Sequence, residues 1–256
     1  MRICRAKHKN EVFYGVIEGD SVLRIAGGPF DKPEYEGSIY SLSDVRLLAP
    51  CEPSKIVAVG KNYSAHAAEM NEGQPEEPLL FIKPGTSVIG SGDTVIYPAI
   101  SKRVDYEGEL GIVIGKKCRY VKEKEFASVV LGYTCLNDVT ARDIQKSVSQ
   151  WTRGKGFDTF CPLGPWIETD IEPGRLNIET RLNKETRQSS NTSYMTHSPG
   201  KLIAYISRTM TLLPGDVIAT GTPEGIGPMQ IGDIVEVEIE GIGTLVNKIT
   251  SEIMPG

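Results

Sequence analysis

The sequence has little of what marks a secreted, membrane-spanning or nucleic-acid-binding protein. Its five cysteines show no CxxC or other paired spacing, and their odd number argues against a complete set of disulfides. The net charge is −5 and there is no run of Lys and Arg, so no charged surface for a nucleic-acid backbone or an anionic membrane is indicated. No apolar stretch approaches the roughly 18 residues of a membrane helix, and the first residues lack the apolar core of a signal peptide. We therefore expect a cytoplasmic protein without nucleic-acid or membrane partners.

Strand and turn signals predict a β-rich α+β protein in two parts. In residues 1–50, a hairpin pattern around Glu18-Gly19-Asp20 and a turn-rich stretch predict a small N-terminal β unit. Residues 51–256 form the larger part, which ends in a strand and a hairpin. Its few helical signals are the stretches KEKEFASVV and ARDIQKSVSQ, and a helix that begins with Ser198 as N-cap and Pro199 at its first position.

Two glutamates stand two positions apart in the strand pattern DYEGELGIVIG. In a strand, Glu107 and Glu109 point to one side while Leu110 and Ile112 point to the other, and two like charges so close need a positive partner. Asp138, which ends the next apolar strand pattern, is a third carboxylate, and three carboxylates favour Mg²⁺, Mn²⁺ or Ca²⁺ over zinc. The spacing alone equally fits the solvent face of an edge strand, with Asp138 capping a helix.

His66 and Glu69 stand three residues apart in NYSAHAAEM. In a helix they share a face, so that Glu69 can orient His66 as a general base. The spacing by itself also fits a solvated surface histidine. His8 and His197 lie in polar segments, and we expect both to be exposed to solvent.

Six motifs together resemble the fumarylacetoacetate hydrolase superfamily. They are KIVAVGKNYSAHAAEM, FIKP, DYEGELGIVIG, NDVTARD, KGFDTFCPLGP and TGTPEGIG, and the resemblance covers about Leu47 to Ile249. It implies a mixed β-sandwich roll, a homodimer and a divalent metal held by Glu107, Glu109 and Asp138. The expected ion is Mg²⁺ or Mn²⁺, with Ca²⁺ as a further candidate.

The resemblance also implies a mobile lid and a cation beside the metal. The lid carries His66 and Glu69, and the glycine and prolines of NEGQPEEP suit its hinge. Three carboxylates and one divalent cation leave a charge of −1, which would repel an anionic substrate unless a cation stood nearby. Lys155 matches the family lysine that contacts the substrate and the developing enolate, whereas we expect Lys146 and Arg153 to be solvated.

Four further residues match substrate-contacting positions of the family. Arg142 and Gln145 follow Asp138 by four and seven positions, so on a helix they face back toward the metal. Thr222 lies in TGTPEGIGP, which fits neither dinucleotide nor P-loop patterns and so argues against nucleotide binding. The fourth residue, Tyr63, could equally serve packing or lid support, as could two other matches, Lys61 and Lys83.

The resemblance implies a metal-dependent hydrolase that cleaves a C–C bond in 2,4-dioxo acids such as fumarylpyruvate, acetylpyruvate or fumarylacetoacetate. The ion would stabilise an enolate while His66, oriented by Glu69, activates water, and the partner is a small anionic oxo acid. The same electron sink would serve oxaloacetate decarboxylation, isomerisation of 2-hydroxyhepta-2,4-diene-1,7-dioate or sugar-acid dehydration, which the sequence does not separate. A metal-binding scaffold without turnover is the non-enzymatic alternative, and in it His66 and Glu69 would be dispensable.

Overall fold

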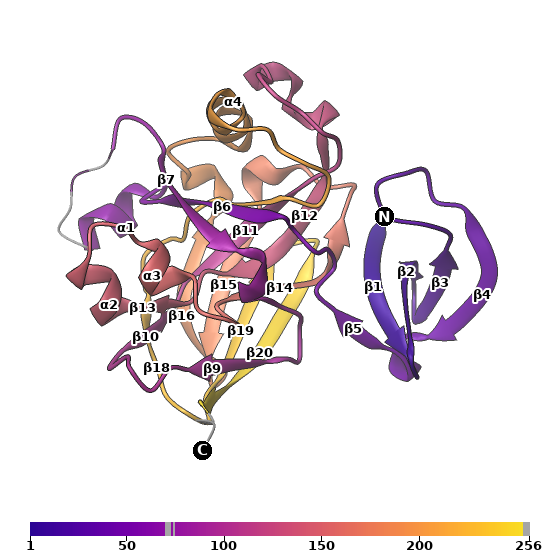
Figure 1. Ribbon diagram of the computed structural model, residues 1–256, viewed down its shortest axis with the longest axis horizontal. Coiled ribbons are helices and arrows are strands. Elements are labelled where there is room, and N and C mark those ends of the chain that lie inside the picture. Colours follow the sequence, from indigo (N-terminus) through magenta and orange to yellow (C-terminus); the bar gives the residue numbers. More distant parts are fainter. Residues whose placement is uncertain (70–72, 74, 253–256) are drawn as a thin grey trace.

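The protein has the β-rich α+β fold that the sequence predicts (Figure 1). The computed structural model describes residues 1–69, 73 and 75–252. Within these residues the strands form sheets of twelve, five and three strands. No helix in the described ranges is long and apolar enough to cross a membrane.

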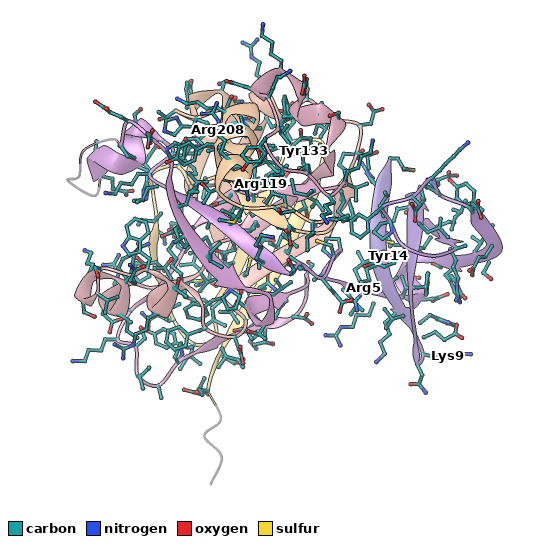
Figure 2. All side chains as sticks on the ribbon, turned by 45° about the horizontal axis from the view of Figure 1, so that its top comes forward. Arg5, Lys9, Tyr14, Arg119, Tyr133 and Arg208 are labelled. Carbon is teal, nitrogen blue, oxygen red and sulfur yellow. The ribbon has the colours of Figure 1, made fainter. Side chains whose placement is uncertain are left out.

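The N-terminal residues form antiparallel strands that stand to one side of the main body (Figure 1). These strands are β1 (Arg2–His8), β2 (Glu11–Glu18), β3 (Ser21–Ile25), β4 (Tyr35–Ser41) and β5 (Arg46–Leu48). Lys9 turns the chain between β1 and β2 at the outer end of this unit, whereas Arg5 and Tyr14 lie where the unit meets the body (Figure 2). Because β1 pairs with β14, the unit continues the large sheet.

The large sheet has the path β4-β3-β2-β1-β14-β12-β11-β17-β6-β7, with β5 paired to β1 and β8 to β14. Its remaining strands are β6 (Lys55–Gly60), β7 (Leu79–Pro84), β8 (Val88–Ile89), β11 (Gly108–Ile114), β12 (Val130–Asn137), β14 (Cys161–Glu168) and β17 (Val217–Ala219). Strand β11 is buried on both faces, which explains why its residues from Leu110 to Ile114 are apolar without alternation.

Two smaller sheets complete the roll. The five-stranded sheet has the order β16-β15-β19-β20-β9, and its hairpin of β19 and β20 is the one predicted at the C-terminal end. Between this sheet and the large one lies the main apolar core, to which helix α4 also contributes. The strands are β9 (Thr94–Tyr97), β15 (Asn177–Leu182), β16 (Glu185–Asn191), β19 (Ile234–Ile239) and β20 (Gly243–Ser251), and in the three-stranded sheet β10 (Val104–Tyr106), β13 (Thr140–Ala141) and β18 (Gly227–Met229).

The helices are short. They are α1 (Ser64–Glu69), α2 (Arg142–Ser147), α3 (Thr152–Lys155) and α4 (Pro199–Thr209), with 3-10 turns at Leu42–Asp44, Gly85–Ser87, Glu123–Ser128, Pro173–Arg175 and Thr192–Tyr194. The predicted N-cap of α4 is confirmed, because the Ser198 side chain accepts a hydrogen bond from the Lys201 N–H. In KEKEFASVV only a 3-10 turn forms, since the β-branched residues that follow enter β12.

His197 is buried, contrary to the expected solvent exposure. Its backbone N–H donates to Asn62 Oδ1 at 2.8 Å and its carbonyl accepts from Asn62 Nδ2 at 3.0 Å, which holds the polar loop against the body. Burial, together with the charge of Lys201, lowers the pKa of His197. His8 is half-buried against the ring of Tyr40. All five cysteines are free, and four of them are buried.

Candidate active site

The three predicted metal ligands lie where the chain passes from one sheet to another. The strand pattern around Glu107 is interrupted, because β10 in the three-stranded sheet ends at Tyr106 and β11 in the large sheet begins at Gly108. Here the Glu107 N–H donates to Asn137 Oδ1 at 2.9 Å and the Gly108 N–H donates to Gln188 Oε1 at 3.0 Å. A Cβ at Gly108 would lie 2.1 Å from the Thr180 hydroxyl in β15, so this crossing requires glycine.

Glu107, Glu109 and Asp138 meet as a buried carboxylate triad. One oxygen from each lies within 4.8 Å of the others. The three residues are 4%, 1% and 1% exposed, which rules out the alternative of a solvent-facing edge strand. Nor does Asp138 cap a helix, because its carboxylate contacts two lysines and helix α2 begins four residues later.

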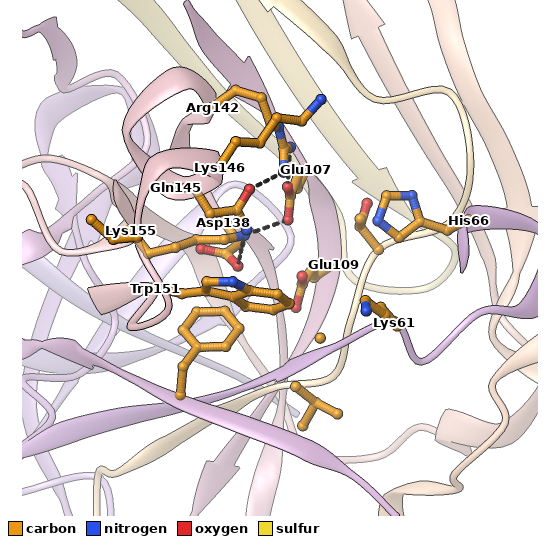
Figure 3. Close-up of a pocket in the computed structure, with 15 residues that line it drawn as sticks. Lys61, His66, Glu107, Glu109, Asp138, Arg142, Gln145, Lys146, Trp151 and Lys155 are labelled. Carbon is orange, nitrogen blue, oxygen red and sulfur yellow. Dashed lines mark hydrogen bonds and ion pairs between the residues drawn. The ribbon is translucent and has the colours of Figure 1, made fainter. Parts of the chain in front are cut away.

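Three cations, those of Lys83, Arg142 and Lys155, neutralise most of this negative charge, and Figure 3 shows the last two. The Lys155 Nζ lies 2.6 Å from a Glu107 oxygen and 2.6 Å from an Asp138 oxygen. The Lys83 Nζ, fully buried, donates to the other Asp138 oxygen at 2.5 Å. Arg142 pairs with Glu107 and, at 2.8 Å, with Asp105. Sequence reasoning left Lys83 without a role, and its position in the FIKP motif was the only signal.

The charges shift the pKa values of these groups in opposite directions. Burial alone would raise the pKa of Glu107, but Lys155 and Arg142 outweigh it and lower this pKa. Burial raises the pKa of Glu109 well above its usual value, and the negative charges of Asp138 and Glu107 add to the rise. Lys155 stays an ammonium, because the two carboxylates that it contacts overcome its burial and raise its pKa.

The triad fits a divalent cation. Its donors are three carboxylate oxygens, which suit Mg²⁺, Mn²⁺ or Ca²⁺. Glu109 accepts a hydrogen bond from the Gly221 N–H at 2.8 Å, but among the described residues it forms no ion pair. Its charge is therefore the one that a bound cation would compensate, in line with its raised pKa.

His66 and Glu69 lie on helix α1 and form the predicted pair. The His66 Nδ1 and a Glu69 oxygen are 3.2 Å apart, and His66 is 6% exposed. Both oxygens of Glu69 also lie within hydrogen-bonding distance of the Gly225 N–H, at 3.1 Å and 3.2 Å. The hinge expected in NEGQPEEP lies partly outside the described residues.

A cavity of about 210 Å³ joins the histidine to the triad (Figure 3). Most of the predicted site residues line it: His66, Glu107, Glu109, Asp138, Arg142, Gln145, Lys155 and Thr222. Phe81 and Trp151, which the sequence did not single out, add an aromatic wall, and their rings meet edge to face at 5.5 Å. Lys146 is exposed, as expected, but also lines the cavity together with Lys61.

The predicted substrate-binding residues differ in what they can offer a ligand. All three guanidinium nitrogens of Arg142 donate hydrogen bonds to protein groups. One of these groups is the Gln145 side-chain oxygen, at 2.7 Å, so the Gln145 amide nitrogen is the atom that can donate to a substrate. Thr222 donates to the Gly108 carbonyl at 2.9 Å. Tyr63 is buried and does not line the cavity, and its hydroxyl has no hydrogen-bond partner among the described residues.

Residues 55–250 match the family described as fumarylacetoacetate (FAA) hydrolase, C-terminal. The chain belongs to the fumarylacetoacetate hydrolase family. Residues 1–50 match a second family, described as Rv2993c-like, N-terminal. The fold and the family predicted from the sequence are thus confirmed.

Relatives of this family member are named for several reactions. Mitochondrial oxaloacetate tautomerase fahd2 of Xenopus laevis is 42% identical over 244 residues, which cover 90% of this chain and 76% of that protein. The crystal structure named 5-carboxymethyl-2-hydroxymuconate delta-isomerase, from Mycobacterium smegmatis, is 48% identical with a TM-score of 0.94, covering 98% of this chain and 100% of that one. Maleylpyruvate hydrolase from Sphingobium, in complex with manganese and pyruvate, is 32% identical with a TM-score of 0.83, covering 99% and 100%.

Proposed function

We propose that this protein is a metal-dependent enzyme that moves a proton within a small enolisable 2-oxo acid, interconverting keto and enol forms of a substrate such as oxaloacetate. The observation that carries the proposal is that the carboxylate triad and the His66–Glu69 pair line one cavity. A metal-binding scaffold without turnover would not need a paired histidine facing its metal.

Glu107, Glu109 and Asp138 would hold Mg²⁺ or Mn²⁺. When bound there, such a cation would supply Lewis-acid stabilisation of an enolate formed from an oxo acid. The manganese and pyruvate in the related maleylpyruvate hydrolase support this choice of ion and ligand.

The chain supplies the groups that handle the protons. His66, oriented by Glu69, removes a proton from C3, and the electron pair moves toward the 2-keto oxygen. Lys155 keeps its ammonium charge, because the carboxylates that it contacts raise its pKa, so it serves as a hydrogen-bond donor that stabilises the negative charge on that oxygen rather than as a base. The enolate oxygen then takes a proton from water, and His66 returns its proton to the solvent. The Gln145 amide can orient the substrate carboxylate.

The cavity favours a compact substrate. Its volume of about 210 Å³ is below the roughly 300–1,000 Å³ of pockets that bind drug-sized ligands. The names of two relatives, an oxaloacetate tautomerase and a delta-isomerase, also describe proton transfer.

Hydrolysis of an acylpyruvate is the second candidate. The His66–Glu69 pair could instead activate a water molecule for attack on the C4 carbonyl, which cleaves the C3–C4 bond and leaves pyruvate in its enolate form. The related maleylpyruvate hydrolase supports this reaction.

The test is to supply the metal-stripped protein with enol-oxaloacetate, acetylpyruvate or fumarylpyruvate, with and without Mn²⁺, and to follow enol absorbance, pyruvate and CO₂. A Mn²⁺-dependent loss of enol absorbance without pyruvate supports tautomerisation. Pyruvate from an acylpyruvate would identify a hydrolase, and CO₂ with pyruvate from oxaloacetate a decarboxylase. If none of these substrates is turned over in a metal-dependent way, the proposal is contradicted.

Variants of the histidine separate chemistry from metal binding. We expect His66→Asn to lower kcat by about 10²- to 10⁴-fold while the Kd for Mn²⁺ changes little. His8→Asn, in the N-terminal unit, is the matched control and should leave both constants unchanged. Full activity of His66→Asn would remove the histidine from the mechanism.

A further inference from the structure

Asn62 links helix α1, called the lid helix here because it carries His66 and Glu69 of the expected lid, to the loop that supports Glu109. It is 0% exposed and lies between the end of β6 and the start of α1. Its side-chain Nδ2 donates to the Thr220 carbonyl at 2.7 Å and to the His197 carbonyl at 3.0 Å, and its Oδ1 accepts the His197 N–H at 2.8 Å. The carboxamide is therefore fully used in joining three separate backbone segments.

The loop that Asn62 holds contacts a metal-ligand residue directly. The Thr220 hydroxyl donates to the Leu110 carbonyl at 2.9 Å, and the next N–H, of Gly221, donates to the Glu109 carboxylate at 2.8 Å. Gly221 has a φ of +98°, and a Cβ there would lie 2.7 Å from the Asn62 Cβ. Asn62 thus packs against the peptide that orients Glu109.

The same loop meets the other end of the lid helix. Its Gly225 N–H lies 3.1 Å and 3.2 Å from the two Glu69 oxygens, and Glu69 is the last residue of α1. Helix α1 is therefore held to residues 220–225 at both ends. Asn62 makes the contact just before the helix begins, and Glu69 makes it at the last residue of the helix. Thr222, between these two ties, lines the cavity.

We infer that Asn62 is a positioning residue, which sets the direction of the Glu109 carboxylate and the base of the lid helix together. Without its carboxamide, two buried carbonyls lose their donors, and the loop must shift to satisfy them. The Gly221 N–H would then leave the Glu109 carboxylate, which is 1% exposed and so cannot readily replace this donor with water. Because partners that orient metal ligands are typically worth about 10- to 100-fold in affinity, we expect a similar loss here. The inference rests on the proposed metal site.

The experiment compares two buried asparagines. Asn247 is 2% exposed and, like Asn62, donates from Nδ2 to two carbonyls, those of Gly90 and Asp93, at 2.8 Å and 2.9 Å. Mn²⁺ alone is titrated calorimetrically into metal-stripped wild type, Asn62→Ala and Asn247→Ala, well below their melting temperatures. Both variants should lose stability, but only Asn62→Ala should raise the Kd for Mn²⁺, by about tenfold or more.

The outcomes separate this inference from the proposed function. An unchanged Kd in Asn62→Ala, or an equal rise in both variants, overturns the positioning role and leaves the metal site intact. A wild-type protein that binds no Mn²⁺ overturns the proposed function and this inference with it. If Asn62→Ala does not fold, Asn62→Ser serves instead. Its single, shorter hydroxyl cannot replace both amide donors, so the Kd for Mn²⁺ should again rise, and an unchanged Kd contradicts the inference.

Discussion

Lys83 and Lys155 bind opposite oxygens of one buried carboxylate, that of Asp138, at 2.5 Å and 2.6 Å. They come from different elements, β7 and α3, and are 0% and 2% exposed. A carboxylate so deeply buried would be costly without these partners. The two lysines thus offset the cost of burying the Asp138 carboxylate.

Replacement of Lys83 should therefore destabilise the protein in a way that metal relieves. We expect Lys83→Met to lower the free energy of unfolding of the metal-free protein by about 3 kcal/mol, because Asp138 loses a partner. Saturating Mn²⁺ should reduce this loss, which chemical denaturation measures. Lys55→Met is the control, since Lys55 pairs with the buried Asp216 and neither residue lines the cavity. The loss of unfolding free energy in Lys55→Met should be the same with and without Mn²⁺. If Mn²⁺ reduced the loss equally in both variants, the prediction would be contradicted.

The two neighbouring glutamates should respond to the same substitution with opposite signs. In the presence of a chelator, which removes metal, Glu109→Gln should raise the melting temperature by a few degrees. The reason is that burial and the neighbouring negative charges disfavour the ionised form of Glu109. Glu107→Gln should lower it by several degrees, because the substitution breaks the pairs with Lys155 and Arg142. Both should abolish stabilisation by Mn²⁺. Thermal denaturation with and without Mn²⁺ tests this prediction. Melting-temperature shifts of the same sign in the two variants would contradict it.

Asp143 should make stability depend on pH below neutrality. Burial acts to raise its pKa, but hydrogen bonds from the Lys102 N–H at 2.9 Å and the Ser101 hydroxyl at 2.7 Å lower it overall. A carboxyl whose folded pKa is lowered contributes stability above its unfolded pKa, about 4, and loses it as the pH falls through the folded value. Asp143→Asn should thus cost about 1 kcal/mol at pH 7, and denaturation at decreasing pH should show this difference closing. A difference that widened in acid would have the wrong sign.

The aromatic wall should be sensitive to a single methyl group. A Cβ at Gly60 would lie 2.5 Å from Trp151 Cζ3, and the ring is backed by Phe81. We expect Gly60→Ala to push Trp151 into the cavity and to lower kcat/KM about tenfold, mainly through KM, without a change in the Kd for Mn²⁺. Gly174→Ala, where a Cβ meets nothing within 4 Å, is the control. An unaltered KM would show that the wall does not limit the substrate.

Much of the fold followed from local patterns. The alternation in β19 and β20, the turn between β2 and β3 and the Ser198 N-cap all depend on neighbours in sequence, and the structure has each of them. The proximity of Glu107, Glu109 and Asp138 was predicted from the family resemblance, since the spacing alone also fitted an edge strand, and in the structure it arises because β11 pairs with β12.

What the sequence did not reveal depends on distant contacts. The pattern around Glu107 suggests one strand, and only the packing of Gly108 against β15 shows why the chain changes sheets there. The burial of His197 and the junction at Asn62 arise from hydrogen bonds between residues 135 to 158 positions apart. Lys83 reaches Asp138 across 55 positions. No local periodicity encodes such pairs.

The balance of charge in the site bears on the order in which the protein matures. Three of the buried carboxylates, those of Asp105, Glu107 and Asp138, pair with four cations, those of Lys83, Arg103, Arg142 and Lys155. In small zinc domains the ligands repel one another until the ion arrives, so folding waits for the metal. Here the chain brings its own counter-ions. We therefore expect the chain to fold without the proposed ion, and to bind and release that ion as an already folded protein.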